Sequence, residues 1–491
     1  MNEDAPTLDE IIGLTRQELT TAQAPDPIRE CGRAALLLLP IDPDICLKLA
    51  YQKLHDVPYK DVKTCWRRLY TDASLYQVLK LAEGRCERDE IDQVVRLLDM
   101  TLILTGAPGR EELVELWFAA LKVALTTTAP EVEAHDPGRP LKRRKLSSSC
   151  QSSSIPTSFP VDFPNPAPTL QYPIQRRKEL SLSAFQKMVS NTKTHSPLVI
   201  EGAIQHWPAL EERPWNNPRY LLEQTLRGRR LIPVEVGKSY TDEGWGQRII
   251  TFREFMETYM LDDPAEATEP TEDNHNNQNR GAYESESDAA PPSKNAQKRP
   301  TGYLAQHDLF AQIPSLRADI SIPDYCYSEP APSPHLTHIK PVAKLDEPLL
   351  NAWFGPAGTI SPLHTDPYHN MLAQVVGYKY VRLYAPDETP NLHPRSVDEN
   401  GVDMSNTSQV DLDEAMALFP HVSSCETRES NNEHEALNAA RTLFEHHFPG
   451  FKDAKYIDAI LGPGECLYLP VGWWHYIRSL TPSFSVSFWF N

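Results

Sequence analysis

The sequence predicts an α+β multidomain protein in which an all-α domain precedes a barrel or jelly roll of β-strands. Through residues 1–125, apolar residues recur every three or four positions, as in Ile91, Val94 and Leu98, which is the period of an amphipathic helix. From Leu349 onward, apolar and polar residues alternate between Gly and Pro turns, and several such strands favour a barrel or jelly roll. With 491 residues, the chain is also longer than one compact core accommodates.

The overall charge and the cysteines exclude several classes of protein. A net charge of −19 argues against a broad nucleic-acid-binding surface, because phosphate binding needs basic surface. The eight cysteines include no CxxC pair, so neither a zinc finger nor a disulfide framework is indicated. The acidic N-terminus lacks the order of a secretion signal, and no apolar run is long enough to span a bilayer. We therefore expect a soluble intracellular protein with no direct nucleic-acid or membrane contact.

The helical region 1–125 is expected to form one domain. Turn signals such as Pro40, Pro58 and Gly106 divide it into about six helices. We find no fixed repeat period, so the pattern supports no named solenoid family. The region contains no catalytic constellation, and we therefore expect its role to be the binding of a protein partner.

Residues 126–168 are rich in Ser, Thr and Pro and nearly free of aromatic residues. Such a composition buries too little apolar surface to offset the entropy of ordering, which predicts a disordered linker. Within it, Lys142, Arg143, Arg144 and Lys145 form a basic run of the kind that nuclear import receptors read. The alternative is a solvated charge run. We predict a nuclear protein, with the cytoplasm as the second location.

Residues 169–491 are predicted to form the second domain. A short helix at 181–189 and strands at 198–201 and from Leu231 open it, and a polar, low-complexity insertion at 262–300 interrupts it. The stretch NMLAQVVGYKYVRLYAP predicts a hairpin that turns at Gly377. A second insertion at about 390–455 includes a helical piece near 433–448.

The strand region includes a candidate metal site. His364 and Asp366 are two residues apart, so on a strand both side chains leave the same face. In a closed barrel, His475 would return beside them as a third ligand. Two imidazoles and one carboxylate form the ligand set of non-haem Fe(II) oxygenases. His369 is a rival, but its odd spacing from Asp366 places it on the opposite face.

Several further stretches carry a family resemblance: PLVIEGAIQHWPAL, VEVGKSYTDEGWGQ, GYLAQHDLF, NAWFGPAGTISPLHTDP, NTSQVDL and SFSVSFWF. With these stretches and the HxD…H triad, residues 170–491 resemble the JmjC domain of Fe(II)- and 2-oxoglutarate-dependent oxygenases. They are most similar to the group described both as lysine-specific demethylase 8 and as protein arginyl hydroxylases. The resemblance implies a double-stranded β-helix, a cupin-like jelly roll, in which His364, Asp366 and His475 are the catalytic metal ligands.

The resemblance also implies three small-molecule requirements, namely Fe(II), 2-oxoglutarate as co-substrate, and O2. The far carboxylate of 2-oxoglutarate needs a cation, and Lys379 matches it, since an inward-facing lysine needs an anionic partner. By the same resemblance, the co-substrate pocket is completed by Tyr303, Ser361 and Asn370, whose hydroxyl and amide groups can donate to carboxylate oxygens.

Substrate selection is assigned by the resemblance to residues around the mouth of the barrel, Glu235, Tyr240, Trp245, Gln306 and Trp353. A carboxylate with aromatic side chains suits a guanidinium, which favours hydroxylation of arginine in a protein substrate. One alternative is demethylation of a histone lysine, in which hydroxylation of an N-methyl group releases formaldehyde. Another is a non-catalytic, chromatin-associated interaction protein.

Overall fold

The computed structural model describes most of the two predicted domains. The insertion predicted at 262–300 and the basic run at 142–145 lie outside the described residues, which are 5–21, 26–83, 88–127, 155–164, 168–191, 196–237, 244–261, 301–332, 336, 339, 341–397, 401–419 and 431–491.

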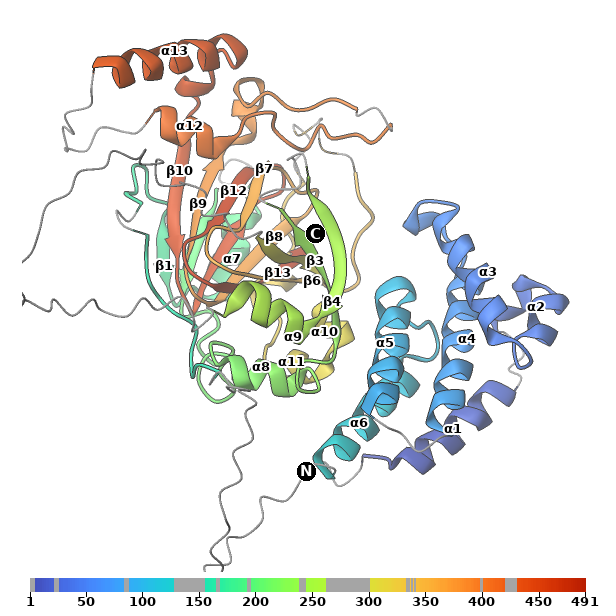
Figure 1. Ribbon diagram of the computed structural model, residues 1–491. Coiled ribbons are helices and arrows are strands. Elements are labelled where there is room, and N and C mark those ends of the chain that lie inside the picture. Colours follow the sequence, from blue (N-terminus) through green and yellow to red (C-terminus); the bar gives the residue numbers. More distant parts are fainter. Residues whose placement is uncertain are drawn as a thin grey trace, which may run out of the picture.

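The N-terminal part of the described chain is helical, as predicted (Figure 1), with α1 Leu8–Thr20, α2 Arg33–Leu38, α3 Pro43–His55, α4 Thr64–Ala82, α5 Arg88–Thr105 and α6 Glu111–Thr127. Local sequence sets the helix starts: Thr7 forms a capping box with Glu10, and Asp42 caps α3. The buried indole of Trp117 on α6 donates to Thr15 on α1 over 2.8 Å, which holds these two helices together. None of the described helices is long and apolar enough to cross a membrane.

Residues 155–164 pack against the C-terminal domain, so the prediction of a disordered linker through residue 168 is wrong for this stretch. Phe159 is only 3% exposed, and its ring lies 5.7 Å from the ring of Phe354. Its backbone N–H donates to the carbonyl of Asn216, and Arg219 donates to the carbonyl of Ile155. One large aromatic side chain anchors a stretch whose average composition predicts no structure.

Two sheets face each other in the C-terminal domain (Figure 1). The larger sheet has nine strands in the order β1-β2-β11-β8-β13-β6-β5-β3-β4, and the smaller has four in the order β10-β9-β12-β7. The strands are β1 Arg176–Lys178, β2 Leu198–Glu201, β3 Leu231–Val236, β4 Gly246–Thr251, β5 Gly302–His307, β6 Leu349–Gly355, β7 Ile360–His364, β8 His369–Val376, β9 Lys379–Tyr384, β10 Tyr456–Leu461, β11 Glu465–Leu469, β12 Trp474–Ser479 and β13 Ser483–Phe490.

Strand alternation divides the larger sheet into two apolar faces. On β8, Leu372 faces a cluster between the sheets that includes Val381 of β9, whereas Met371 faces a larger cluster on the other side. The larger cluster lies under short helices that cover the outer face, namely α7 Leu182–Val189, α8 Pro218–Gln224, α9 Phe252–Phe255, α10 Leu309–Gln312 and α11 Pro314–Arg317. The polar site residues therefore lie between the sheets, where the inner cluster is small.

The turn at Gly377 does not form a hairpin, and this prediction is wrong. β8 pairs with β11 and β13 in the larger sheet, whereas β9 pairs with β10 and β12 in the smaller one. Gly377 has φ +70°, and a Cβ there would collide with the carbonyl oxygen of Pro482. Only glycine permits this close approach in the left-handed region. The turn is the corner at which the chain passes from one sheet to the other, and it carries Lys379 into the smaller sheet.

The second insertion covers the outer face of the smaller sheet. It includes the predicted helix as α13 Asn431–His447, preceded by α12 Leu412–Leu418 (Figure 1). Phe444 of α13 and Leu412 of α12 share an apolar cluster with Trp474 of β12. Ahead of α12, Thr407 forms an isolated antiparallel bridge with His364, so the insertion also pairs with the free edge of β7.

Candidate active site

The three predicted metal ligands come together at one end of the smaller sheet. His364 ends β7, Asp366 follows it in a loop, and His475 lies in β12. Asp366 lies 3.8 Å from Nε2 of His364 and 3.5 Å from Nε2 of His475, and one ligand atom from each residue falls within 4.8 Å of the others. Atoms bound to one ion at roughly 2.0–2.2 Å lie about 3–3.5 Å apart, so the group can hold a metal ion with little movement.

A β-bulge gives the site its shape. In the pairing of β12 with β7, His475 lies opposite His364 and Ile477 lies opposite Ser361, so two steps on β12 match three on β7. Leu363 packs in the outer cluster with α12 and α13. The extra residue lets Ser361 and His364, which are an odd number of positions apart, both face the interior.

Each imidazole has one nitrogen bound to the backbone. Nδ1 of His364 lies 2.7 Å from the carbonyl of Pro362, and Nδ1 of His475 lies 3.1 Å from that of Trp473. Because a carbonyl can only accept, each Nδ1 carries the proton and each Nε2 keeps a lone pair for a metal. Burial and the neighbouring His364 lower the pKa of His475 well below its usual value, which favours the neutral, ligating form.

The remaining carboxylate, Asp366, lies beside the indole of Trp489, a residue that sequence reasoning missed. Burial raises the pKa of Asp366, and His364 and the indole of Trp489 oppose this shift. Trp489 also stacks on Tyr368 with ring centroids 5.5 Å apart. In the sequence, Trp489 continues the alternation of Ser485 and Ser487 along β13, and this pattern could have indicated that the three side chains share one face of the strand. The rival ligand His369 lies outside the group, as predicted, with Nδ1 3.0 Å from the hydroxyl of Tyr468.

Lys379 is buried between the sheets. Lys379 is 2% exposed, and its Nζ donates to the Tyr303 hydroxyl over 3.3 Å. Among the described residues, no carboxylate forms an ion pair with it, and burial lowers the pKa of Lys379 to about 7. Burial raises the pKa of Tyr303, while a hydrogen bond with Ser361 opposes this shift. A buried, uncompensated cation is costly for an empty pocket and fits an anionic ligand.

Asn370 supplies a second unpaired group in this region. It is 5% exposed on β8, and its Oδ1 has no hydrogen-bond partner among the described residues. Buried amide groups are normally satisfied, so this atom also fits a site built for a polar ligand. Because Oδ1 only accepts hydrogen bonds, it would need a donor from the ligand, and Lys379 is the group here that suits a carboxylate.

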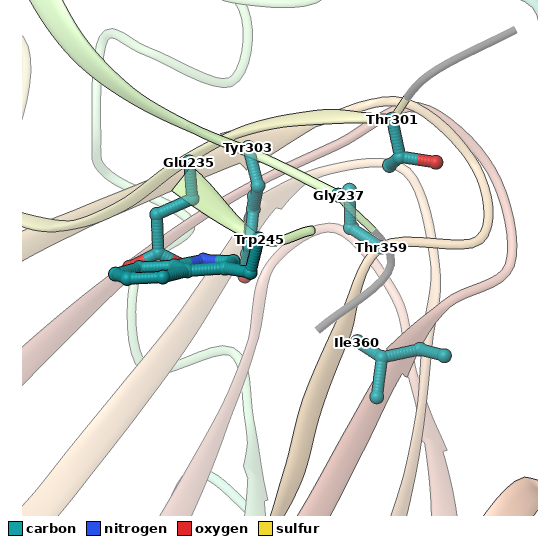
Figure 2. Close-up of a pocket in the computed structure, with 7 residues that line it drawn as sticks. All are labelled: Glu235, Gly237, Trp245, Thr301, Tyr303, Thr359 and Ile360. Atoms are coloured by element: carbon teal, nitrogen blue, oxygen red, sulfur yellow. The ribbon is translucent and has the colours of Figure 1, made fainter. Parts of the chain in front are cut away.

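The predicted substrate residues are only partly brought together. Figure 2 shows a pocket in which the indole of Trp245 lies beside the carboxylate end of Glu235, with Tyr303 adjoining both. Trp245 Nε1 donates to Glu235 over 3.4 Å. Burial raises the pKa of Glu235, and the hydrogen bond from Trp245 opposes this shift. Trp353 does not line this pocket, but its ring centroid lies 6.0 Å from that of Tyr303, and its indole donates to Ser487 over 2.9 Å.

The last two substrate candidates have different outcomes. Gln306 lies on β5 with a left-handed φ of +47°, at a register shift between Leu304 and His307 in the pairing with β6. Tyr240 lies outside the described residues.

Comparison with known families matches both parts of the chain. Residues 183–491 match the cupin-like domain, and residues 43–133 match KDM8-like N-terminal ARM repeats. The expectation that no solenoid family applies is therefore wrong for the helical domain. The matched residues contain α3 to α6, which are 13 to 19 residues long, and this variation hides a fixed period in a single sequence.

The similarity to several relatives extends over both parts of the chain. Lysine-specific demethylase 8 of Danio rerio is 32% identical over 91% of this chain and 86% of its own length. Its counterpart from Xenopus tropicalis is 31% identical over 94% and 89%, and lysine-specific demethylase JMJ30 of Arabidopsis thaliana is 32% identical over 90% and 84%. The chain therefore belongs to the JmjC family of cupin-like 2-oxoglutarate-dependent dioxygenases, in the group that resembles lysine-specific demethylase 8.

Proposed function

We propose that this dioxygenase acts on a cationic side chain of a protein, and that the reaction is demethylation of N-methyl-lysine. The observation that carries this choice is the name shared by three relatives that match most of the chain, each a lysine-specific demethylase. The sequence-based preference for arginine hydroxylation has weaker support, because no relative cited above is named for it.

In the proposed site, His364, Asp366 and His475 would hold Fe(II), and Lys379 with Tyr303, Ser361 and Asn370 would hold the far carboxylate of 2-oxoglutarate. When bound, iron and 2-oxoglutarate supply an oxidant from O2, with release of succinate and CO2. The overall demethylation balances as N-methyl-lysine, O2 and 2-oxoglutarate giving lysine, formaldehyde, succinate and CO2.

The chain's own residues orient the reactants and limit access of water. The backbone bonds of both imidazoles keep Nε2 free for the metal. Lys379 needs its proton to pair with a carboxylate, and a bound dianion raises its affinity for that proton. Leu372 and Val381 belong to an apolar cluster between the sheets, which keeps water out of that part of the interior.

Arginine hydroxylation is the second candidate, and the carboxylate of Glu235 favours it. Glu235 faces the pocket of Figure 2 next to Trp245, and a deprotonated carboxylate can pair with two guanidinium N–H groups. A trimethylated ammonium offers no N–H donor and would use only the charge and the aromatic ring.

Product mass separates these reactions. Purified enzyme, Fe(II) and 2-oxoglutarate are incubated with matched peptides that contain mono-, di- or trimethyl-lysine, or unmodified arginine. Demethylation lowers the peptide mass by about 14 Da and releases formaldehyde, whereas hydroxylation raises it by about 16 Da and releases none. Loss of 14 Da supports the first candidate and a gain of 16 Da on arginine the second. Neither change on any peptide, with 2-oxoglutarate turnover intact, rejects both.

We also propose that the protein acts in the nucleus on a protein substrate. The support is the basic run from Lys142 to Lys145 in an otherwise acidic chain. A fluorescent fusion should concentrate in the nucleus, and replacement of the four basic residues by alanine should disperse it. An unchanged nuclear signal in the alanine variant would reject the role of this run.

A further inference from the structure

One side chain of the helical domain is buried inside the junction with the JmjC domain. Asp99 of α5 is fully buried. Its carboxylate accepts from Arg230 Nε over 2.9 Å and from Arg230 Nη2 over 2.7 Å, from the Leu231 N–H over 2.7 Å, and from Gln312 Nε2 over 2.8 Å. The guanidinium of Arg230 in turn lies 3.5 Å from the ring centroid of Phe118 on α6.

The partners of Asp99 adjoin the two strands that carry the substrate pocket, because Arg230 and Leu231 lie at the start of β3 and Gln312 of α10 contacts the end of β5. Leu231 begins β3, and Glu235 lies four residues further along the same strand. Gln312 accepts on Oε1 from His307, the last residue of β5, over 2.7 Å, because its amide nitrogen already donates to Asp99 and to the Leu231 carbonyl. The carboxylate of Asp99 thus anchors the start of β3 and, through the side chain of Gln312, the end of β5.

The two anchored strands meet in the pocket itself. Glu235 of β3 pairs in register with Tyr303 of β5, and both line the pocket of Figure 2. Next to His307, Gln306 has a left-handed backbone, which a non-glycine residue keeps only where surrounding contacts hold it. The contact of His307 with Gln312 is one that holds this stretch.

We propose that Asp99 is a positioning residue for the substrate pocket, so that the helical domain completes the active site of the JmjC domain. The inference rests on the proposed function to the extent that Glu235 and Gln306 face the substrate. It predicts that loss of this contact affects the peptide step more than the co-substrate site, because β5 contributes only Tyr303 to that site.

The test compares two neutralised carboxylates of the helical domain in the full chain. Asp99→Asn leaves Arg230 buried without its counter-charge at the junction. Asp72→Asn is the matched control, because Asp72 is 4% exposed and pairs with Arg68 and Arg110 inside the helical domain. Asp99→Asn should lower kcat/KM for the peptide by roughly 10- to 100-fold, as misplacement of a binding group does. The KM for 2-oxoglutarate should rise by no more than about 2- to 10-fold, the loss expected from Tyr303 alone.

A second measurement does not depend on knowing the substrate. Amide hydrogen exchange should quicken in β3 and β5 of Asp99→Asn and stay unchanged in those strands of Asp72→Asn. Equal effects of both variants, or unchanged exchange in β3 and β5 of Asp99→Asn, would overturn the inference. If wild-type enzyme turns over no peptide, the proposed function fails, and the exchange experiment still decides whether Asp99 holds the two strands.

Discussion

His475 lies directly opposite His364 in the antiparallel pairing of β12 with β7, with the ring centroids 4.1 Å apart. The two residues are 111 positions apart in the chain, yet a single register places both imidazoles beside Asp366. The metal site is therefore a property of strand pairing, and its integrity can be tested separately from turnover.

Replacing His475 by alanine should weaken metal binding beyond the roughly 10- to 100-fold loss typical of residues that only orient a ligand. The reason is that His475 would supply one of the three ligand atoms within 4.8 Å of one another. Calorimetric titration with Mn²⁺, a redox-inert substitute for Fe(II), measures the change. His55→Ala, on the exposed face of α3, is the matched control. Equal affinity of the His475 variant and wild type would contradict the assigned site.

Lys379→Met should weaken 2-oxoglutarate binding by about 10- to 100-fold, which is the loss expected when a hydrogen bond from a charged group is removed. Exposed Lys187→Met should have no effect. Affinity for 2-oxoglutarate should also fall as pH rises above about 7, because the free protein then loses the Lys379 proton that the complex requires. Titration in buffers of different ionisation enthalpy at pH 8 should show proton uptake on binding. A constant affinity between pH 7 and 9 would argue against Lys379 as the carboxylate partner.

The same lysine affects the stability of the ligand-free protein. An unfolded lysine keeps its proton up to about pH 10.4, whereas folded Lys379 loses it near pH 7. Between these values the unfolded state binds more protons, so this group's contribution to the free energy of unfolding rises with pH. Denaturant unfolding of wild type and Lys379→Met at pH 7 and pH 9 should show a gain in wild type relative to the variant. The opposite sign would mean that Lys379 is charged in the free protein.

Tyr303→Phe should reduce affinity for 2-oxoglutarate by about 2- to 10-fold, because it removes a single hydroxyl hydrogen bond from the pocket and keeps the ring. The affected hydroxyl is the one that Lys379 contacts at 3.3 Å. Tyr468→Phe is the matched control, since it removes a buried hydroxyl that instead contacts His369. Isothermal titration of both variants measures the difference, and a larger loss in the Tyr468 variant would reject the role of Tyr303.

Gly377→Ala should destabilise the fold by about 2–5 kcal/mol, the sum of left-handed strain and overpacking. A Cβ at this corner would collide with Pro482 and Thr481. Gly358 has a similar φ of +84° but nothing within 4 Å of an added Cβ, so Gly358→Ala should cost only about 1–2 kcal/mol. Equilibrium unfolding in urea compares the two variants. Equal destabilisation would show that crowding at the corner is unimportant.

The sequence by itself was informative where the relevant geometry is local. The two-residue spacing predicts that His364 and Asp366 share a site, and they do, although Asp366 lies in the loop after β7. His369 lies outside the group, as predicted, but because it begins β8 in the other sheet. Helical periodicity predicted the region that contains α1 to α6, and because each helix imposes its own period, no distant contact is needed to predict it. Lys379 was assigned to the co-substrate pocket through the family resemblance, and the structure buries it.

Only the tertiary structure decided how these pieces are joined. The bulge that turns Ser361 and His364 to the same side, the passage between sheets at Gly377, and the anchoring of Phe159 depend on partners far away in the chain. The same is true of Asp99, an unremarkable helix residue in the sequence that becomes the buried centre of the domain junction. Register and domain docking are set by long-range packing, which the residue periodicity of one segment does not encode.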